Sequence, residues 1–354
     1  MPPTPAASVF KITNLVSNSA AIAATHTDPD LVNAWGVAFL PTAAGWIANQ
    51  GTSTSTFYGG GGVAEGPAVT IPVGTAGIAG PTGIVGNTTS DFIIGSGAAA
   101  QPSEFIFADL GGAILGWSPG VNPDTAVIAV DNGASGASYT GLALGHDSDG
   151  NNFLYAANFA QAKVDVFDQT FAPVTTAGGF VDVNIPQGYA PFGIQNLPAS
   201  DGSAQIYVAY AEVDPSTHRS MAGAGLGFVD VFDAAGTLIK RVISGGALNA
   251  PWGIALAPSS FGSLGGKLLI GNFGDGTINA FDPSTASAAG SLMINNQVVV
   301  IPGLWGIAFG NGQDSQPSTT LFFAAGPNNE TEGVYGRIDF GPPSTSGMGS
   351  PPSY

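Results

Sequence analysis

A short motif that recurs six times along the 354 residues constrains the fold more than any other feature. Each copy has an aromatic residue or threonine, then a glycine, then an aliphatic run. The glycines are Gly36, Gly83, Gly141, Gly193, Gly253 and Gly306. Their spacings are 47, 58, 52, 60 and 53 residues, close to the length of a four-stranded propeller blade. The repeat therefore predicts six consecutive units of one kind.

Further strands follow each motif. β-Branched and aromatic residues bounded by Gly, Pro, Asn and Asp are typical of strands. Second strands are expected at 46–49, 105–109, 154–158, 206–210, 268–272 and 321–325, and third strands at 113–117, 164–168, 229–233, 278–282 and 334–339. Fourth, outer strands are expected at 68–72, 126–130, 180–183, 238–243 and 298–301. No segment of twelve or more residues shows the apolar stripe of a helix.

The sixth unit has no fourth strand, while residues 9–16 form a strand pattern that no unit claims. We therefore predict an all-β fold, a six-bladed β-propeller of four-stranded blades over residues 1–340. The N-terminal strand, about residues 8–16, completes the last blade and closes the ring, which protects that blade's edge. A flexible tail rich in Pro, Ser and Gly follows at 341–354. Six matched strand pairs disfavour the alternative, a β-sandwich.

Composition excludes several classes of function. Seven Lys and Arg against 24 Asp and Glu give a net charge of -17, which repels nucleic acid and anionic membranes. No apolar stretch is long enough for membrane insertion. The absence of Cys excludes disulfides, zinc-thiolate sites and thiol catalysis. Acidity, scarce Lys and abundant Gly, Ser, Thr and Asn favour an extracellular or periplasmic protein, whose signal peptide is absent from this sequence.

Propeller geometry gathers two sets of residues around one mouth of the central channel. The strand-start ring precedes the glycines and contains Trp35, Thr82, Thr140, Phe192, Trp252 and Trp305; the second-strand ring contains Asn49, Asp109, Asn158, Tyr210, Asn272 and Ala325. Aromatic faces and amides bind neutral polar ligands by stacking and hydrogen bonding. The predicted ligand site comprises Trp35, Phe192, Trp252, Trp305, Tyr210, Asn33 and Asn249. In the alternative interpretation, the rings only fill and knit the channel.

The strand starts, together with the Val-Asp-Val-Phe-Asp segments at 164–168 and 229–233, resemble the NHL-repeat and gluconolactonase (senescence-marker) group of six-bladed propellers. The longer signatures at 28–36, 248–254 and 271–276 are more similar to an uncharacterised family of exported bacterial and fungal propeller proteins. This second resemblance covers about residues 8–340. It implies a fold and export, and no particular activity.

The gluconolactonase resemblance implies a calcium or zinc ion at the channel mouth, held by a Glu, two Asn and an Asp. Some of those ligands stand just before the strand-start glycine, where this sequence has only Trp, Thr and Phe. Asn49, Asp109, Asn158 and Asn272 still offer oxygens that calcium could use. Streptogramin-inactivating lyases, which share the fold, need a His base. The histidines of this chain, His26, His146 and His218, fall in neither ring and are expected in loops.

Three interpretations of function stay open at this point. The first is an exported acidic propeller that acts as a binding or surface protein, with a glycan, another neutral polar molecule or a protein at the channel mouth. The second is a calcium-assisted hydrolase, lactonase or lyase that uses the Asn and Asp ring. The third is an extracellular matrix component that self-associates through the weakly charged sides of its blades.

Overall fold

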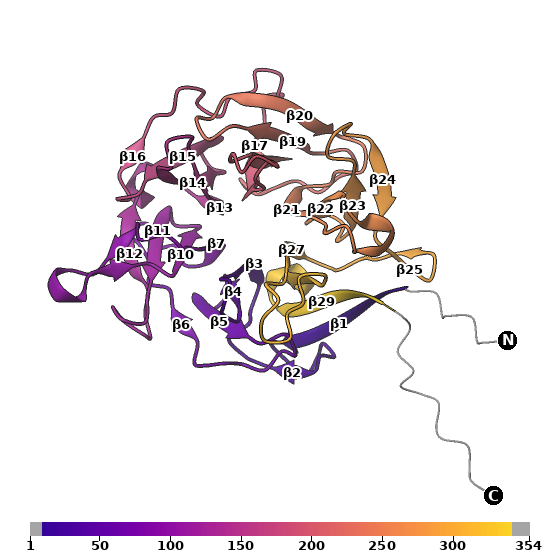
Figure 1. Cartoon of the computed structure of the whole chain (residues 1–354), viewed down its shortest axis with the longest axis horizontal. Helices are drawn as coiled ribbons and strands as arrows, with labels where there is room; N and C mark the ends of the chain where they lie inside the picture. The colour runs from indigo at the N-terminus through magenta and orange to yellow at the C-terminus, as the bar shows by residue number, and fades with distance from the viewer. Residues whose placement is uncertain (1–8, 342–354) are drawn as a thin grey trace, which may run out of the picture.

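A computed structural model describes residues 9–341, which form six β-sheets arranged in a ring around an axis (Figure 1). Each sheet has an innermost strand: β3 (Ala34–Phe39), β7 (Pro81–Gly86), β13 (Tyr139–His146), β17 (Tyr189–Asn196), β21 (Pro251–Leu256) and β27 (Leu304–Phe309). The second strands are β4 (Gly45–Asn49), β10 (Phe105–Asp109), β14 (Asn152–Asn158), β18 (Ile206–Glu212), β22 (Leu268–Asn272) and β28 (Leu321–Ala325). The predicted all-β, six-bladed propeller is confirmed.

Third and fourth strands complete the blades. The third strands are β5 (Thr54–Tyr58), β11 (Ala113–Trp117), β15 (Lys163–Asp168), β19 (Phe228–Phe232), β23 (Ile278–Phe281) and β29 (Val334–Gly341). The fourth are β6 (Val69–Thr70), β12 (Val127–Asp131), β16 (Pro173–Val174), β20 (Leu238–Ser244), β24 (Ala288–Ser291) and, in the sixth blade, β1 (Val9–Ser17). Short additions are β2 (His26–Thr27), β8 (Ile93–Ile94), β9 (Gln101–Pro102), β25 (Met293–Ile294), β26 (Gln297–Val298) and α1 (Pro327–Glu330). Within residues 9–341, no helix has the length and apolarity to cross a membrane.

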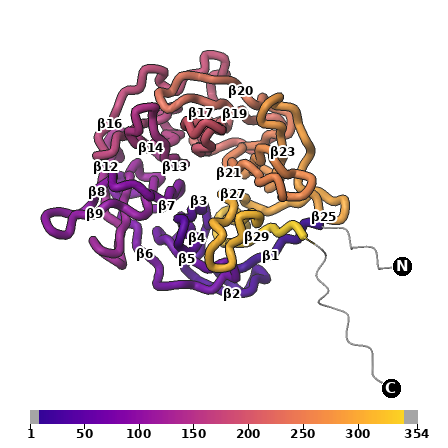
Figure 2. The backbone as a smooth tube through the Cα atoms, in the orientation of Figure 1, coloured from indigo at the N-terminus to yellow at the C-terminus, as the bar shows by residue number. Residues whose placement is uncertain are grey.

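The two ends of the described chain share the sixth sheet. Strand β1 pairs antiparallel with β29 from Val9 opposite Gly341 to Ser17 opposite Val334. The indigo start of the chain therefore runs beside its yellow end in Figure 2. The predicted closure of the ring by the N-terminal strand is confirmed. The predicted tail lies, apart from Gly341, outside the described residues.

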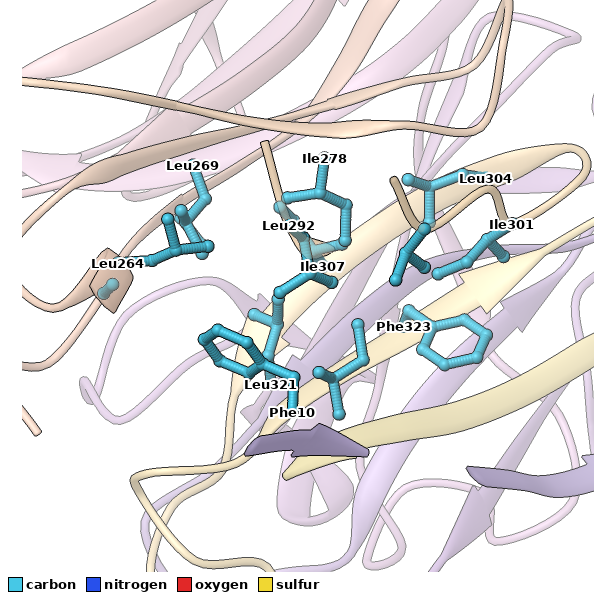
Figure 3. Packing of buried hydrophobic residues seen from close by; sticks show 14 of the residues in the cluster. Phe10, Leu264, Leu269, Ile278, Leu292, Ile301, Leu304, Ile307, Leu321 and Phe323 are labelled. Atoms are coloured by element: carbon cyan, nitrogen blue, oxygen red, sulfur yellow. The ribbon is translucent and has the colours of Figure 1, made fainter. Parts of the chain in front are cut away.

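Closure also completes a hydrophobic core between the fifth and sixth blades. Figure 3 shows Phe10 of β1 among side chains of both blades. Phe10 is 7% exposed, and its partners in this cluster include Leu264 and Leu269 of the fifth blade and Leu321 and Phe323 of the sixth. Burying a Phe side chain stabilises a fold by about 1.5–3 kcal/mol. The first described strand thus adds apolar packing as well as hydrogen bonds.

The repeated glycines stand where innermost strands of neighbouring blades approach most closely. A Cβ atom at Gly83 would lie 2.3 Å from the backbone nitrogen of Leu142, and one at Gly193 would lie 2.1 Å from the carbonyl oxygen of Trp252. Contacts that short do not occur between real atoms, so any larger residue would push two blades apart. The motif therefore marks close backbone approach rather than a turn.

Two predicted outer strands are wrong. In the third blade, residues 180–183 form no strand, and β16 pairs with β15 instead. In the fifth blade, β24 pairs with β23, while residues 297–298 belong to a separate hairpin. Phe180 and Val299 are nevertheless buried, in the cores between blades. Their apolar character reflects that packing, which a strand pattern cannot distinguish from sheet pairing.

Candidate functional site

Six aromatic side chains meet at the axis and form what we call the axial aromatic cluster: Trp35, Phe159, Phe192, Trp252, Phe273 and Trp305. The rings of Trp35 and Trp305 stack with centroids 3.5 Å apart and an interplanar angle of 15°. Phe273 stacks on Trp305 at 3.9 Å. Trp252 meets Trp305 edge-on at 6.0 Å. Four of the predicted ligand-binding residues thus come together from four blades.

Innermost strands supply the three tryptophans and Phe192, whereas Phe159 and Phe273 directly follow the second strands β14 and β22. Where the strand-start residue is threonine, it joins blades instead. Thr82 donates its hydroxyl hydrogen to the carbonyl of Tyr139 at 2.7 Å, and Thr140 donates to the carbonyl of Phe192 at 2.8 Å. The strand-start ring therefore joins neighbouring blades by hydrogen bonds and also fills the axis of the propeller.

The indole N–H groups of the three axial tryptophans differ in their partners. Trp305 donates to Oδ1 of Asn33 at 2.9 Å, and Trp252 donates to the carbonyl of Thr140 at 2.8 Å. Trp35 is only 3% exposed, yet its N–H has no acceptor among the described residues. Buried donors of this kind nearly always have a partner. Within residues 9–341, Trp35 is consequently the one axial tryptophan whose indole N–H has no hydrogen-bond acceptor.

A cavity of about 310 Å³ opens above the cluster, and we call it the mouth cavity. Trp35, Phe159, Phe192 and Trp305 form its aromatic side. Its polar groups belong to Gln50, Ser138, Thr140, His218, Arg219, Ser220 and Glu330. Two apolar side chains, Ile78 and Leu110, complete the lining. Residues that are up to 295 positions apart in the chain, Trp35 and Glu330, thus share one small space.

Two loops supply the charged part of this lining. The β18–β19 loop, residues 213–227, and the β28–β29 loop, residues 326–333, are the longest connections between second and third strands in the ring. Arg219 of the first loop forms an ion pair with Glu330 of the second. Glu330 also accepts a hydrogen bond from the Asn33 amide at 3.2 Å. This bridge joins the fourth blade to the sixth beside the cavity.

Sequence reasoning missed these groups. The expectation that His218 lies in a loop is confirmed, but sequence reasoning did not place that loop beside the cavity, and it gave no role to Arg219 or Glu330. The signal was the unequal length of the connections, since 213–227 is far longer than its counterparts 50–53 and 159–162. Because loops carry functional residues disproportionately, the long connection 213–227 indicated that functional residues lie there.

The two predicted amides, Asn33 and Asn249, hold parts of the mouth in place. Asn33 is fully buried and donates to Gln50 at 2.8 Å in addition to its bonds to Trp305 and Glu330. Asn249 accepts a hydrogen bond from the backbone N–H of Gly223, in the β18–β19 loop, at 2.7 Å. Neither residue lines the mouth cavity. Their contacts position the groups that do.

Tyr210 lies elsewhere. It packs in the core between the third and fourth blades, in a cluster that includes Tyr155, Phe180 and Phe232. Its hydroxyl has no hydrogen-bond partner among the described residues. Burial raises the pKa of Tyr210 far above its usual value. The structure does not bring this side chain to the mouth cavity.

The four proposed calcium ligands are buried at the ends of second strands, each in a different blade. The three asparagine amides are bonded locally: Asn49 donates to Thr56 at 3.0 Å, Asn158 to Asp165 at 2.7 Å and Asn272 to the carbonyl of Ala247, between the fourth and fifth blades, at 2.8 Å. No hydrogen bond links one member of the set to another within residues 9–341. That part of the chain also holds no group of three His, Cys, Asp or Glu side chains able to bind a metal.

Asp109 is the one carboxylate in that set. It is 1% exposed, and its Oδ1 accepts a hydrogen bond from the backbone N–H of Ala113 at 2.7 Å. Its Oδ2 has no partner in the described structure. Burial raises the pKa of Asp109 to about 6, although backbone hydrogen bonds oppose the rise. The carboxyl group therefore gains a proton under mildly acidic conditions.

Replacing Asp109 by asparagine is expected to change how stability depends on pH. Because the folded pKa lies above the unfolded value, the contribution of Asp109 is fully present below about pH 4 and is lost as pH rises through about 6. Relative to wild type, Asp109→Asn should therefore gain about 1–3 kcal/mol between pH 4 and pH 7. Urea unfolding at both pH values measures the difference. Asp149→Asn, an exposed change of equal charge, is the control, and parallel profiles for all three proteins would contradict the expectation.

Comparisons with known proteins find relatives along nearly the whole chain. "Uncharacterized protein R648" of Acanthamoeba polyphaga mimivirus is 34% identical over 343 residues, which cover 95% of this chain and 82% of the relative. "Uncharacterized protein L690" of the same virus is 31% identical over 343 residues, which cover 95% and 87%. No protein-family model matches the chain.

Solved structures with the same fold are far more distant in sequence. A protein of unknown function from Bacteroides thetaiotaomicron has a TM-score of 0.56 at 7% identity, covering 94% of this chain and 76% of that one. A glucose dehydrogenase has a TM-score of 0.52 at 12% identity, covering 92% and 99%. A catalytically inactive virginiamycin B lyase from Staphylococcus aureus, with quinupristin, has a TM-score of 0.51 at 12% identity, covering 94% and 99%. These likenesses show the propeller fold alone. The sequence relatives show more: the chain belongs to the family of the mimivirus proteins R648 and L690.

Proposed function

We propose that the protein is a binding protein that holds a small neutral polar ligand, of the glycan class, in the mouth cavity. The cavity volume of about 310 Å³ lies in the range of small-molecule sites, which combine apolar walls with a few polar groups. The observation that carries the proposal is Trp35. Trp35 lines the cavity, and its buried indole N–H has no acceptor among the described residues; a ligand oxygen that reached this group would supply one.

The polar lining supports a hydroxyl-rich ligand. Arg219 and Ser220 can donate hydrogen bonds, Glu330 can accept them, and Gln50 can do both. The opposite charges of Arg219 and Glu330 neutralise each other in an ion pair, so this part of the lining suits an uncharged ligand better than an ion. The aromatic rings that line the cavity can stack against the apolar face of a sugar ring. Trp305 cannot stack on a ligand with either face, because Trp35 and Phe273 cover both.

We also propose that the protein acts outside the cell, in the extracellular space or the periplasm. Its resemblance to exported bacterial and fungal propellers and its acidic composition support this location. The two relatives described above are viral proteins, whose names state no location.

Replacing Trp35 by phenylalanine is the matched test, because it keeps an aromatic ring in the stack and removes the indole N–H together with part of the ring system, a change that the control below shares. Loss of one buried hydrogen bond to the ligand should weaken glycan binding about tenfold. Glycan-array screening of the wild type identifies the ligand, and calorimetry with that glycan measures the effect. In the control Trp252→Phe, the lost N–H bonds Thr140 rather than the cavity, so affinity should stay within about twofold. Equal affinity of all three proteins, or no bound glycan, would refute the proposal.

A further inference from the structure

A β-hairpin follows the fifth blade and stands at the outer rim of the ring. Strands β25 and β26 form this hairpin, in which Met293 lies opposite Val298. Asn295 and Asn296 connect the strands with φ angles of 53° and 62°, as in the tight turns that join two antiparallel strands. Figure 1 shows β25 at the rim beside the start of β1, and the two strands lie close together.

The second strand of the hairpin continues to residue 301 and has a free edge; we call residues 297–301 the rim strand. The N–H groups of Val299 and Ile301 donate to carbonyls of neighbouring segments at 2.9 and 2.8 Å. Because main-chain groups alternate in direction along a strand, those of Val298 and Val300 point to the opposite side. No segment within residues 9–341 pairs with the rim strand along that side.

The solvent-facing side of the hairpin is apolar. Met293, Val298 and Val300 are 44%, 46% and 56% exposed. Side chains alternate between the two faces of a strand, so Val299 lies on the other face, where it is buried in the core of the fifth and sixth blades. Val9, at the start of the nearby strand β1, is 40% exposed. A free strand edge and an apolar face therefore coincide.

The rim strand lacks the features that normally keep a free edge from pairing with another chain. Charged side chains and proline are the usual protection, and the outer strand β20 has such charges in Lys240 and Arg241. The rim strand reads Gln-Val-Val-Val-Ile and contains neither. It lies in a stretch, residues 283–313, that includes no charged side chain. Its edge is therefore well suited to pair with another strand.

Charge and symmetry indicate which partner this edge fits. Because the chain has a net charge of -17, two copies repel each other over most of their surfaces, and the repulsion is weakest where charges are absent. The rim strand is also complementary to itself. In an antiparallel pair centred on Val299, the outward main-chain groups of Val298 in one copy face those of Val300 in the other. A twofold axis repeats this match, so a second copy supplies the matching edge.

From these observations we propose that two copies of the protein associate through their rim strands, paired antiparallel about a twofold axis. The two hairpins then form one continuous sheet, and Met293, Val298 and Val300 of both copies lie on one face of it. A few side chains from each copy make a small interface, and interfaces below about 1,200 Å² are typically transient. The proposal is independent of glycan binding, because no residue of the hairpin lines the mouth cavity.

Sedimentation of the full chain between about 10 µM and about 1 mM measures this association. We expect a monomer–dimer equilibrium with a dissociation constant of about 10–100 µM, in the range of transient contacts. Raising the NaCl concentration from about 50 to about 500 mM should tighten the dimer at least twofold, because salt screens the repulsion between acidic copies. A chain that sediments as a monomer at about 1 mM would overturn the proposal.

Substitutions locate the contact. Val298→Asp should raise the dissociation constant at least tenfold, because each copy would bring a carboxylate into the paired edge. Val300→Asp serves if the first variant fails to fold. The matched control is Val183→Asp, which makes the same change at a side chain that is 88% exposed outside the hairpin and should leave the constant unchanged. A dimer that persists undiminished in a folded rim-strand variant would overturn the assignment to this strand.

Amide exchange followed by nuclear magnetic resonance reports on the main chain itself. The N–H groups of Val298 and Val300 should exchange at least threefold more slowly at about 1 mM protein than at about 20 µM, because pairing protects them only in the dimer. The N–H of Val299, which is bonded within its own chain, should show no such dependence on concentration. A dimer without this protection at Val298 and Val300 would rule out edge-to-edge pairing.

Discussion

Deletion of residues 1–16 is expected to destabilise the whole propeller by at least about 5 kcal/mol, a loss comparable with the total stability of many domains. The deletion removes nearly all of β1 and with it the antiparallel ladder to β29. It also removes Phe10, whose loss from a core alone costs about 3–5 kcal/mol. The exposed edge of β29 would then be free to pair with other molecules. Thermal and urea unfolding followed by circular dichroism measure the effect.

A deletion that stops at residue 8 is the matched control, since it keeps all of β1. Its unfolding midpoint should equal that of the full chain. Should the longer deletion give no soluble protein, Phe10→Ala compared with Lys11→Ala separates core from surface within the same strand, because Phe10 is buried and Lys11 is exposed. A propeller that melts unchanged without residues 1–16 would show that β1 does not close the ring.

Replacement of Trp305 by alanine is expected to cost about 3–5 kcal/mol of unfolding free energy. Trp305 is 1% exposed, lies between Trp35 and Phe273, and bonds Asn33 through its indole N–H. The alanine variant leaves a cavity at the axis and an unpaired buried amide oxygen on Asn33. Trp305→Phe keeps an aromatic ring and should cost less, about 1–3 kcal/mol for the lost hydrogen bond. Urea unfolding of the three proteins gives these differences, and a loss below about 1 kcal/mol in the alanine variant would contradict a packed axis.

The spacing of the glycines was enough to predict the ring, because neighbouring backbones approach so closely at Gly83 and Gly193 that a Cβ atom has no room there. The last blade was predictable because residues 9–16 had no other place in a six-unit repeat. Outer strands were harder. A two-residue strand such as β16 leaves almost no pattern, whereas Phe180 and Val299 look like strand residues because the cores between blades bury them.

The candidate site was predictable only in part, for a similar reason. Residues at repeat positions, such as Trp35 and Trp305, lie at the axis because the repeat places every strand start there. Arg219 and Glu330 lie in loops that no repeat describes, and their ion pair depends on how those loops cross the mouth. Sequence spacing also cannot show that Trp305 has both faces covered or that Trp35 has no acceptor in the part of the chain that the structure describes. Such features follow from packing in three dimensions.

Nuclear Overhauser contacts between the rings of Trp35 and Trp305 are the most direct test of the proposed structure. Both the axial aromatic cluster and the mouth cavity depend on the stacking of these two rings. These residues are 270 positions apart in sequence, yet their centroids lie 3.5 Å apart in the structure. Single Trp→Phe variants assign the five indole N–H signals of the chain. We predict strong ring-to-ring contacts between Trp35 and Trp305 and an indole N–H of Trp305 protected from exchange by Asn33. Absence of the contacts, with rapid exchange of the Trp305 N–H, would contradict the arrangement.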